Sequence, residues 1–181
     1  VTVARLVQQL RAIGLAISKR QLVRLLIDGK ERFVGEAGAV LRAGLETARW
    51  IAVDDTGARH GAANGVCTQI GDARFTFFAT TASKSRLNFL ERLRAGHGDY
   101  VVNDAAVEYM RRRALPDHAI ARLVQHPQKR FVGARSWHRH LRRLGLHKLK
   151  HSLEPMRLAS EGALWGSIVG HGLLLDTVIV S

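Results

Sequence analysis

At Trp50–His60 the sequence reads WIAVDDTGARH, an apolar run followed at once by two carboxylates. Residues 50–53 are typical of a buried strand, because aromatic and β-branched residues favour strands and no polar residue interrupts the run. Burying an unpartnered carboxylate costs on the order of several kcal/mol, so Asp54 and Asp55 are expected to be solvated, hydrogen-bonded or bound to a cation where this strand leaves the sheet. A plain Asp-Thr-Gly turn is the alternative, since Asp and Gly are good turn residues.

Charge divides the chain into parts with different chemistry. The 181 residues, 46% of them hydrophobic, suffice for one core with a small additional subdomain, and the net charge of +13 favours a polyanionic partner, nucleic acid first. Residues 1–50 carry +5, residues 51–104 are neutral and residues 105–157 carry +10. Such a division suits a protein that gathers carboxylates around metal ions and holds DNA phosphates on basic surfaces to either side.

Cysteine usage and the apolar runs indicate the compartment. The single cysteine, Cys67, excludes an internal disulfide and indicates a reducing environment. Charged residues interrupt the opening apolar positions, and Gly, Ser, His and Asp break the apolar stretch at 163–180, so we predict no signal peptide, no membrane helix and no membrane partner. Because the sequence opens on Val rather than Met and stops within an apolar run at 177–181, we expect a piece of a longer protein. The reducing environment that the lone cysteine indicates makes the cytoplasm its expected location.

Apolar residues at helical spacing predict two short helices before residue 28, with Gly14 between them and Ser18 as the N-cap of the second. This arrangement is compatible with a helix-turn-helix, and the alternative is a helical hairpin with a solvated basic face. The side chains of the second helix expected to face inward are Leu22, Val23, Leu25 and Leu26. Those expected to reach phosphates or base edges are Lys19, Arg20, Gln21 and Arg24. A third helix is predicted at 36–49, and residues 1–48 form the expected DNA-binding segment.

Beyond the acid pair, the pattern predicts a meander, a helix and one more strand. Runs at 65–70 and 74–80 are typical of the second and third strands, with a turn at 61–64. A capped helix then extends to Gly96, and residues 100–102 are the candidate fourth strand. This is the opening order of an RNase H-like α/β fold, a mixed sheet in which an antiparallel meander is joined by a fourth strand parallel to the first.

That adjacency has a chemical consequence. Acids at the carboxyl ends of two neighbouring parallel strands could share a pair of divalent ions about 4 Å apart, which activate water and stabilise a phosphoryl-transfer transition state. We therefore predict Asp54 and Asp104 as catalytic residues and Asp54, Asp55 and Asp104 as metal ligands, in a core whose first part spans residues 49–104. The alternative for Asp104 is a helix N-cap, which Asp also suits.

Residues 105–152 are helical in pattern and strongly basic, which predicts an inserted DNA-contacting subdomain. In its last helix Trp137 and Leu141 share one face and cations occupy the other. The expected DNA contacts are Arg111, Arg112, Arg113, Arg135, Arg139, Arg142 and Arg143. A solvated basic helix is the alternative. Residues 153–181 are predicted to return to the core as a helix and a strand.

These features together resemble a known family. The Val-Asp-Asp-Thr sequence at 53–56 after an apolar strand, the Ser-Lys-Ser-Arg sequence within 80–93 and the preceding helix-turn-helix candidate resemble bacterial insertion-sequence transposases of the DDE type, most closely the group numbered sixty-six. The resemblance covers most of the chain. Residues 111–150 look like an insertion with no counterpart in the shorter members.

The resemblance implies an RNase H-like core that uses three carboxylates and two Mg²⁺ ions to nick and transfer DNA strands. It also implies that the partner is duplex DNA at the insertion-sequence ends and that the protein is located at the bacterial nucleoid. A homodimer is compatible with this resemblance. By position Asp54 matches the first acid, with Asp55 as the acidic residue beside it. The second acid is either Asp104 or a residue beyond Ser181, since residues 176–181 also resemble the strand before that acid. The third has no convincing match, because the helix of Glu161 comes too early.

Because the set of three catalytic carboxylates is incomplete in this chain, we expect the chain to be inactive alone. The rival hypothesis is a non-catalytic DNA-binding regulator of the helix-turn-helix type, in which the acids are turn and cap residues. A third is an RNA-binding accessory domain. The position of Asp54 relative to Asp104 separates the first hypothesis from the second.

Overall fold

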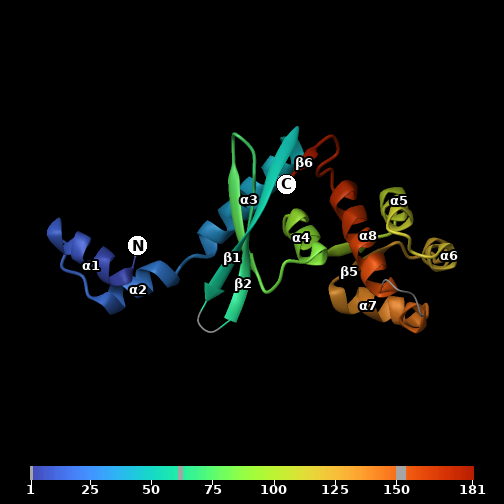
Figure 1. The fold of residues 1–181 in the computed structure, drawn as a ribbon, viewed down its shortest axis with the longest axis horizontal. Coiled ribbons are helices and arrows are strands. Elements are labelled where there is room, and N and C mark those ends of the chain that lie inside the picture. The colour runs from blue at the N-terminus through green and yellow to red at the C-terminus, as the bar shows by residue number, and fades with distance from the viewer. Residues whose placement is uncertain (1, 61–62, 150–153) are drawn as a thin grey trace. The chain divides into compact units, whose positions relative to one another are not determined.

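The computed structural model describes residues 2–60, 63–149 and 154–181 and has a mixed α/β architecture (Figure 1). One compact unit spans Val1–Gly38 and the other Ala39–Ser181. The domain boundary predicted at 152/153 lies outside the described residues, as do Gly61 and Ala62 of the predicted turn. Within the described ranges no helix combines the length and the apolar surface that crossing a membrane requires.

Two short helices, α1 (Val3–Ala12) and α2 (Lys19–Ile27), make up most of the first unit. The start of α2 is set by a capping box, as the Ser18 N-cap predicted. The Ser18 hydroxyl accepts a hydrogen bond of 3.1 Å from the Gln21 amide, and Gln21 Oε1 accepts one of 2.9 Å from the Ser18 amide. Two backbone donors that would otherwise lack partners at the helix end are thereby satisfied.

Few apolar side chains of this unit are buried. Val7 and Leu22 are buried and Val23 is half-buried. Leu25 and Leu26, predicted to face inward, are 62% and 51% exposed. That prediction was wrong because two helices of this length can cover only a narrow stripe of each other, so the helical period does not by itself bury every apolar position.

The main sheet has four strands in the order β3-β2-β1-β6, namely β1 (Trp50–His60), β2 (Ala63–Gly71), β3 (Thr76–Thr81) and β6 (Val178–Val180). The first three form the predicted antiparallel meander, and β6 lies parallel to β1 (Figure 1). Because β2 pairs with β1 as far as His60, the Asp54-Asp55 pair lies within the strand and not at its end. The sheet is therefore mixed, as the sequence predicted.

A second sheet contains the strand that was predicted to lie beside β1. β4 (Asp99–Val101) pairs antiparallel with β5 (Arg130–Val132), and the two form a sheet of their own. The parallel position predicted for residues 100–102 is wrong, because β5 supplies the backbone partners of β4. The sequence around β5 was predicted to be helical throughout, and a strand of three residues leaves little periodic signal.

Helices occupy most of the remaining second unit: α3 (Glu31–Thr47), which begins in the first unit, α4 (Arg86–Leu93), α5 (Asp104–Arg112), α6 (Asp117–Gln125), α7 (Ala134–Arg143), the 3-10 helix η1 (Leu146–Lys148) and α8 (Pro155–Gly170). Most residues of α8 are buried, and it passes between α4 and α5 (Figure 1). Gly162 and Gly166 permit this close packing, since an added Cβ would lie 2.5 Å from Met110 Cγ and 2.3 Å from the Val101 carbonyl oxygen.

Candidate functional site

The acid pair on β1 has its two side chains on opposite faces of the sheet, because neighbouring residues of a strand alternate. Asp54 is exposed and Asp55 is half-buried. The Thr68 hydroxyl, directly across on β2, donates a hydrogen bond of 2.6 Å to Asp55 Oδ1, and Lys84 Nζ lies 3.6 Å from Asp55 Oδ2. In the part of the chain that the structure describes, no side chain makes such a bond to Asp54, so its carboxylate is the one open to a ligand.

β6 lies beside the amino-terminal part of β1. Their parallel register runs from Trp50 opposite Val178 to Ala52 opposite Val180, so Asp54 is the second residue after the paired segment. Two strands were candidates for this position, residues 100–102 and residues 176–181. The structure puts the second of them next to the acid-bearing strand.

Asp104 lies elsewhere. It is the first residue of α5, after the N-cap Asn103, whose Oδ1 accepts a hydrogen bond of 3.0 Å from the Ala106 amide. The strand before it, β4, belongs to the other sheet. The predicted placement of Asp54 and Asp104 at neighbouring strand ends is therefore wrong. In its observed position the Asp104 carboxylate interacts favourably with the positive end of the helix dipole.

The described residues do not form the two-magnesium site that the resemblance implies. Among them no group of three or more His, Cys, Asp and Glu side chains is placed to hold a metal ion. Asp54 and Asp55 point to opposite faces, so they do not converge on one ion, and Asp55 is already bonded to Thr68 and paired with Lys84. Asp54 alone fits the part of an accessible oxygen ligand.

On α2, three of the four predicted DNA contacts are available. Lys19, Arg20 and Arg24 are exposed, and Arg20 and Arg24 share one face because they are four residues apart. Gln21 differs, since its side-chain oxygen closes the capping box with Ser18. Its role in the described structure is to start the helix.

The three consecutive arginines at the end of α5 differ in their surroundings. Arg111 is exposed, Arg112 forms an ion pair with Glu108 one turn earlier, and Arg113 is half-buried. Positive charge at a helix C-terminus is itself stabilising, so these residues have a structural role whatever they bind. Their expected contribution to DNA binding is accordingly smaller than their number suggests.

α7 presents a dense basic face, as predicted. Trp137 and Leu141 are fully buried, and the Trp137 indole donates a hydrogen bond of 2.9 Å to the Ser160 hydroxyl of α8. The exposed cations on the other face are Arg135, Arg139, Arg142 and Arg143. Three of them, with His138 and Met156, line a hollow of about 550 Å³, and none of the described residues that line it is acidic. Its lining is suited to phosphate oxygens.

Behind this face lies a buried histidine. His140 stacks on Phe131 with ring centroids 4.2 Å apart, and among the described residues neither of its ring nitrogens has a hydrogen-bond partner. Burial is the main cause that lowers the pKa of His140 to about 4, and the neighbouring His126 and Arg143 lower it further. His140 is therefore uncharged at neutral pH and belongs to the apolar side of α7.

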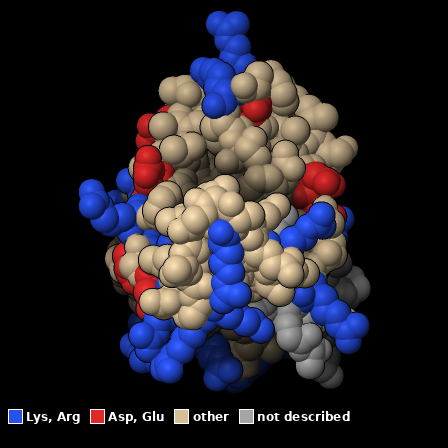
Figure 2. All heavy atoms as spheres, turned by 90° about the vertical axis from the view of Figure 1, so that its left-hand side faces the viewer, with Lys and Arg blue, Asp and Glu red and all other residues tan. Residues whose placement is uncertain are grey.

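Basic side chains are also more frequent than acidic ones on the wider surface. Figure 2 shows lysine and arginine side chains projecting over much of the face that it draws, with aspartate and glutamate side chains in fewer places. Surface charge of this sign attracts nucleic acid through its phosphates, without regard to base sequence.

The chain is similar to a known bacterial protein. The chain is 46% identical over 142 residues to the uncharacterized protein y4jO of Sinorhizobium fredii, a match that includes 78% of this chain and 44% of the relative. The chain thus spans less than half the length of the relative that it matches. No family model matches the chain. No solved structure gives a significant match either.

Proposed function

We propose that this chain is part of a DDE-type DNA transposase with an RNase H-like core, which in a longer protein cleaves and transfers DNA strands and which is inactive in this form. The observation that carries the proposal is the strand order β3-β2-β1-β6 with β6 parallel to β1. An RNase H-like sheet has this order, with the acid-bearing strand at the centre and a parallel strand beside it.

The register adds to this support. Ala52 lies opposite Val180, so the residue two positions beyond Val180 in the same register would be level with Asp54. Residues level with one another on parallel strands point to the same face of the sheet. A carboxylate at that position of a longer protein would converge with Asp54 on one ion.

Mg²⁺ is the metal that this proposal requires in the intact protein. Asp54 is its first ligand, through an exposed carboxylate oxygen, which is the ligand type that Mg²⁺ prefers. Asp55, held by Thr68 and Lys84, supports the strand from the other face. The further acids come from the longer protein, so no reaction step is assigned to this chain alone.

The proposed substrate is duplex DNA at the ends of an insertion sequence, bound by the cations of α2 and α7. Support comes from the net charge of +13 and from the hollow lined by Arg135, Arg139 and Arg142. Location at the bacterial nucleoid follows from such binding. A homodimer, which would hold two DNA ends together, belongs to the same proposal.

The test is metal-dependent cleavage of end-containing duplex DNA by the longer protein. Asp54→Asn is expected to reduce cleavage at least about 100-fold with DNA affinity unchanged, because it removes a metal ligand. Asp104→Asn should retain activity within about threefold, since Asp104 is the first residue of α5, after a strand of the other sheet. Asp176→Asn, an exposed acid just before β6, is the matched control. Loss of cleavage with Asp104→Asn but not with Asp54→Asn would refute the assignment.

A second candidate, a non-catalytic DNA-binding regulator, has its own support. Asp55 is hydrogen-bonded within the sheet and Asp104 starts a helix, which are the structural roles that this candidate assigns to the acids. It predicts tight DNA binding without cleavage by the longer protein, whatever the metal and whatever residue occupies position 54. Equal affinity for duplex DNA and structured RNA would favour an RNA-binding accessory domain instead.

A further inference from the structure

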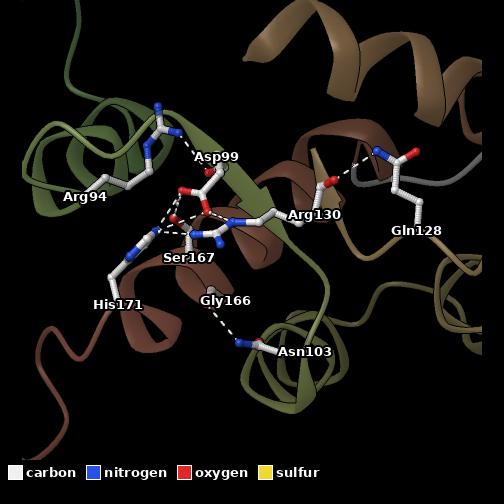
Figure 3. A network of polar contacts seen from close by, with 8 residues as sticks. All are labelled: Arg94, Asp99, Asn103, Gln128, Arg130, Gly166, Ser167 and His171. Carbon is white, nitrogen blue, oxygen red and sulfur yellow. Dashed lines mark hydrogen bonds and ion pairs between the residues drawn. The ribbon is translucent and has the colours of Figure 1, made fainter. Parts of the chain in front are cut away.

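A buried carboxylate joins three elements of the second unit. Asp99, at the start of β4, is 5% exposed. It accepts hydrogen bonds from Ser167 Oγ of α8 at 2.8 Å and from Arg130 Nε of β5 at 2.5 Å, and His171 Nε2 lies 3.1 Å from both of its carboxylate oxygens (Figure 3). The carboxylate is surrounded by donors.

Asp99 is ionised at neutral pH. Burial would raise its pKa, but hydrogen bonds from Ser167, Arg130 and His171 outweigh burial and lower the pKa to about 2. Arg94 contacts the backbone of Asp99 instead. Its guanidinium donates to the Asp99 carbonyl oxygen and forms an ion pair with Glu91.

The outer side of this network holds two guanidinium groups, of Arg42 and Arg130, and two imidazole rings, of His97 and His171. The Arg130 side chain is 59% exposed, and its Nη2 lies 2.9 Å from His171 Nε2. The His97 ring stacks on the His171 ring with centroids 3.6 Å apart and planes within 8°. Arg42 Nη2 of α3 donates a hydrogen bond of 3.0 Å to the Ala95 carbonyl oxygen, two residues before His97.

These groups repel one another when they are charged. Burial lowers the pKa of His97, and His171, Arg42 and Arg130 lower it further, while Asp99 raises it. His171 Nε2 faces a guanidinium nitrogen of Arg130 and the Asp99 carboxylate at the same time. A second anion beside the imidazoles would relieve this repulsion.

Two other chemistries fit the cluster less well. Ser167 and His171 both contact Asp99, so the serine is not activated as a nucleophile. The two imidazoles are stacked, and among the described residues no group of three ligands is placed to hold a metal ion. The guanidinium and imidazole donors of this cluster are suited to an anion that accepts several hydrogen bonds.

We propose that Arg42, His97, Arg130 and His171 form a binding site for a tetrahedral oxyanion of the phosphate class, which binds more tightly as the pH falls and the imidazoles take up protons. The site is distinct from Asp54 and does not depend on DNA cleavage. The phosphate group belongs either to a nucleic-acid backbone or to a small phosphorylated molecule.

The test is an NMR titration of the histidine rings of the full chain, with sulfate as probe and chloride at equal ionic strength as reference. Sulfate stays doubly charged from pH 5.5 to pH 8, so any pH dependence reports the protein. Sulfate is expected to raise the pKa of His97 by about one unit and to move the ring resonances of His171. An unchanged pKa of His97 together with unmoved His171 resonances would overturn the proposal.

Two variants identify the cations. Arg42→Gln should weaken sulfate binding about fivefold or more, because it removes a charged donor from the site. Arg92→Gln removes the same charge from an exposed position on α4 and should leave binding unchanged. Equal losses from both variants would show a diffuse charge effect and overturn the proposal. Asp54→Asn should not alter the sulfate response, which separates this site from the proposed transposase chemistry.

The source of the phosphate follows from two further probes. If a backbone phosphate binds, a short DNA duplex moves the same two ring resonances, and Arg42→Gln abolishes the change. If a small phosphorylated molecule is the ligand, inorganic phosphate moves them and the duplex does not. Failure of sulfate, phosphate and duplex alike refutes the site.

Discussion

The two basic helices α2 and α7 have similar sequence patterns and different surroundings. Both alternate cations with apolar residues at helical spacing. In α7 the apolar residues Trp137 and Leu141 are fully buried, whereas in α2 Leu22 is buried and Leu25 and Leu26 are more than half exposed. The pattern thus predicts which face carries charge. How firmly that face is held depends on what the other face packs against.

The largest expected effect concerns the buried face of α7. Trp137→Ala should destabilise the second unit by about 3–5 kcal/mol, because it leaves a cavity and removes the hydrogen bond to Ser160. Denaturant unfolding followed by tryptophan fluorescence measures this, since the remaining Trp50 and Trp165 both belong to the second unit. Leu22→Ala is the matched change on α2 and should not shift the denaturant midpoint of this transition. Equal shifts of the midpoint by both variants would mean that α2 and α7 are stabilised by packing to the same extent.

The second prediction concerns the loss of folding stability at acidic pH, because α7 contains a buried histidine and α2 has none. The pKa of His140 is about 4 in the folded chain and its ordinary value is 6.5, so the folded state resists a proton that the unfolded state accepts. The stability that this difference contributes is complete above about pH 6.5 and is lost as the pH falls towards about 4, on the order of 3 kcal/mol in all.

Melting temperatures of wild type and His140→Phe at pH 7 and pH 5 check this expectation. The variant should lose less stability between the two values, since phenylalanine has no proton to accept. Asp99, with its pKa lowered to about 2 from 3.8, affects stability only below about pH 4 and does not disturb the comparison. An equal loss in both proteins would contradict the role of His140.

The third prediction concerns DNA affinity. Arg139→Gln with Arg142→Gln should weaken duplex binding about tenfold at low salt and reduce the salt slope by about two, because each cation neutralises one phosphate. Lys19→Gln with Arg20→Gln on α2 should have a smaller effect, since the apolar side of that helix is less buried.

The arginines of α5 provide the control for charge alone. Replacing Arg111, Arg112 and Arg113 by Gln removes three charges, but Arg112 is paired with Glu108 and Arg113 is half-buried, so we expect a smaller change in the slope than from the two arginines of α7. Fluorescence anisotropy at several salt concentrations measures all three sets. If the changes in the salt slope follow only the number of charges removed, the expected difference between the helices is contradicted.

The smallest expected effect concerns how each helix begins. Ser18→Ala removes the capping box of α2 and should cost about 1 kcal/mol of local stability, seen as a loss of far-UV helical signal. α7 has no side-chain cap at its start and depends on burial instead. The tryptophan transition of the second unit should not move with Ser18→Ala. A shift in it would show that the α2 cap supports more than its own helix.

Several elements of the site were predictable because their signals are local. The Ser18 cap, the antiparallel meander and the buried face of α7 follow from patterns within a few residues of one another. The accessible carboxylate of Asp54 was expected from its position after an apolar run. Its catalytic role stays a prediction.

Sequence by itself determined the local elements of this protein, since hydrophobic period and capping depend on neighbours along the chain. Tertiary structure decided which strand lies beside β1. Because β4 pairs with β5 in a separate sheet, β6 occupies the position beside β1. Tertiary structure also assembled Asp99, Arg130 and His171, whose separations of 31 to 72 residues carry no periodic signal. Contacts of that range are set by how the elements pack, which a local pattern does not encode.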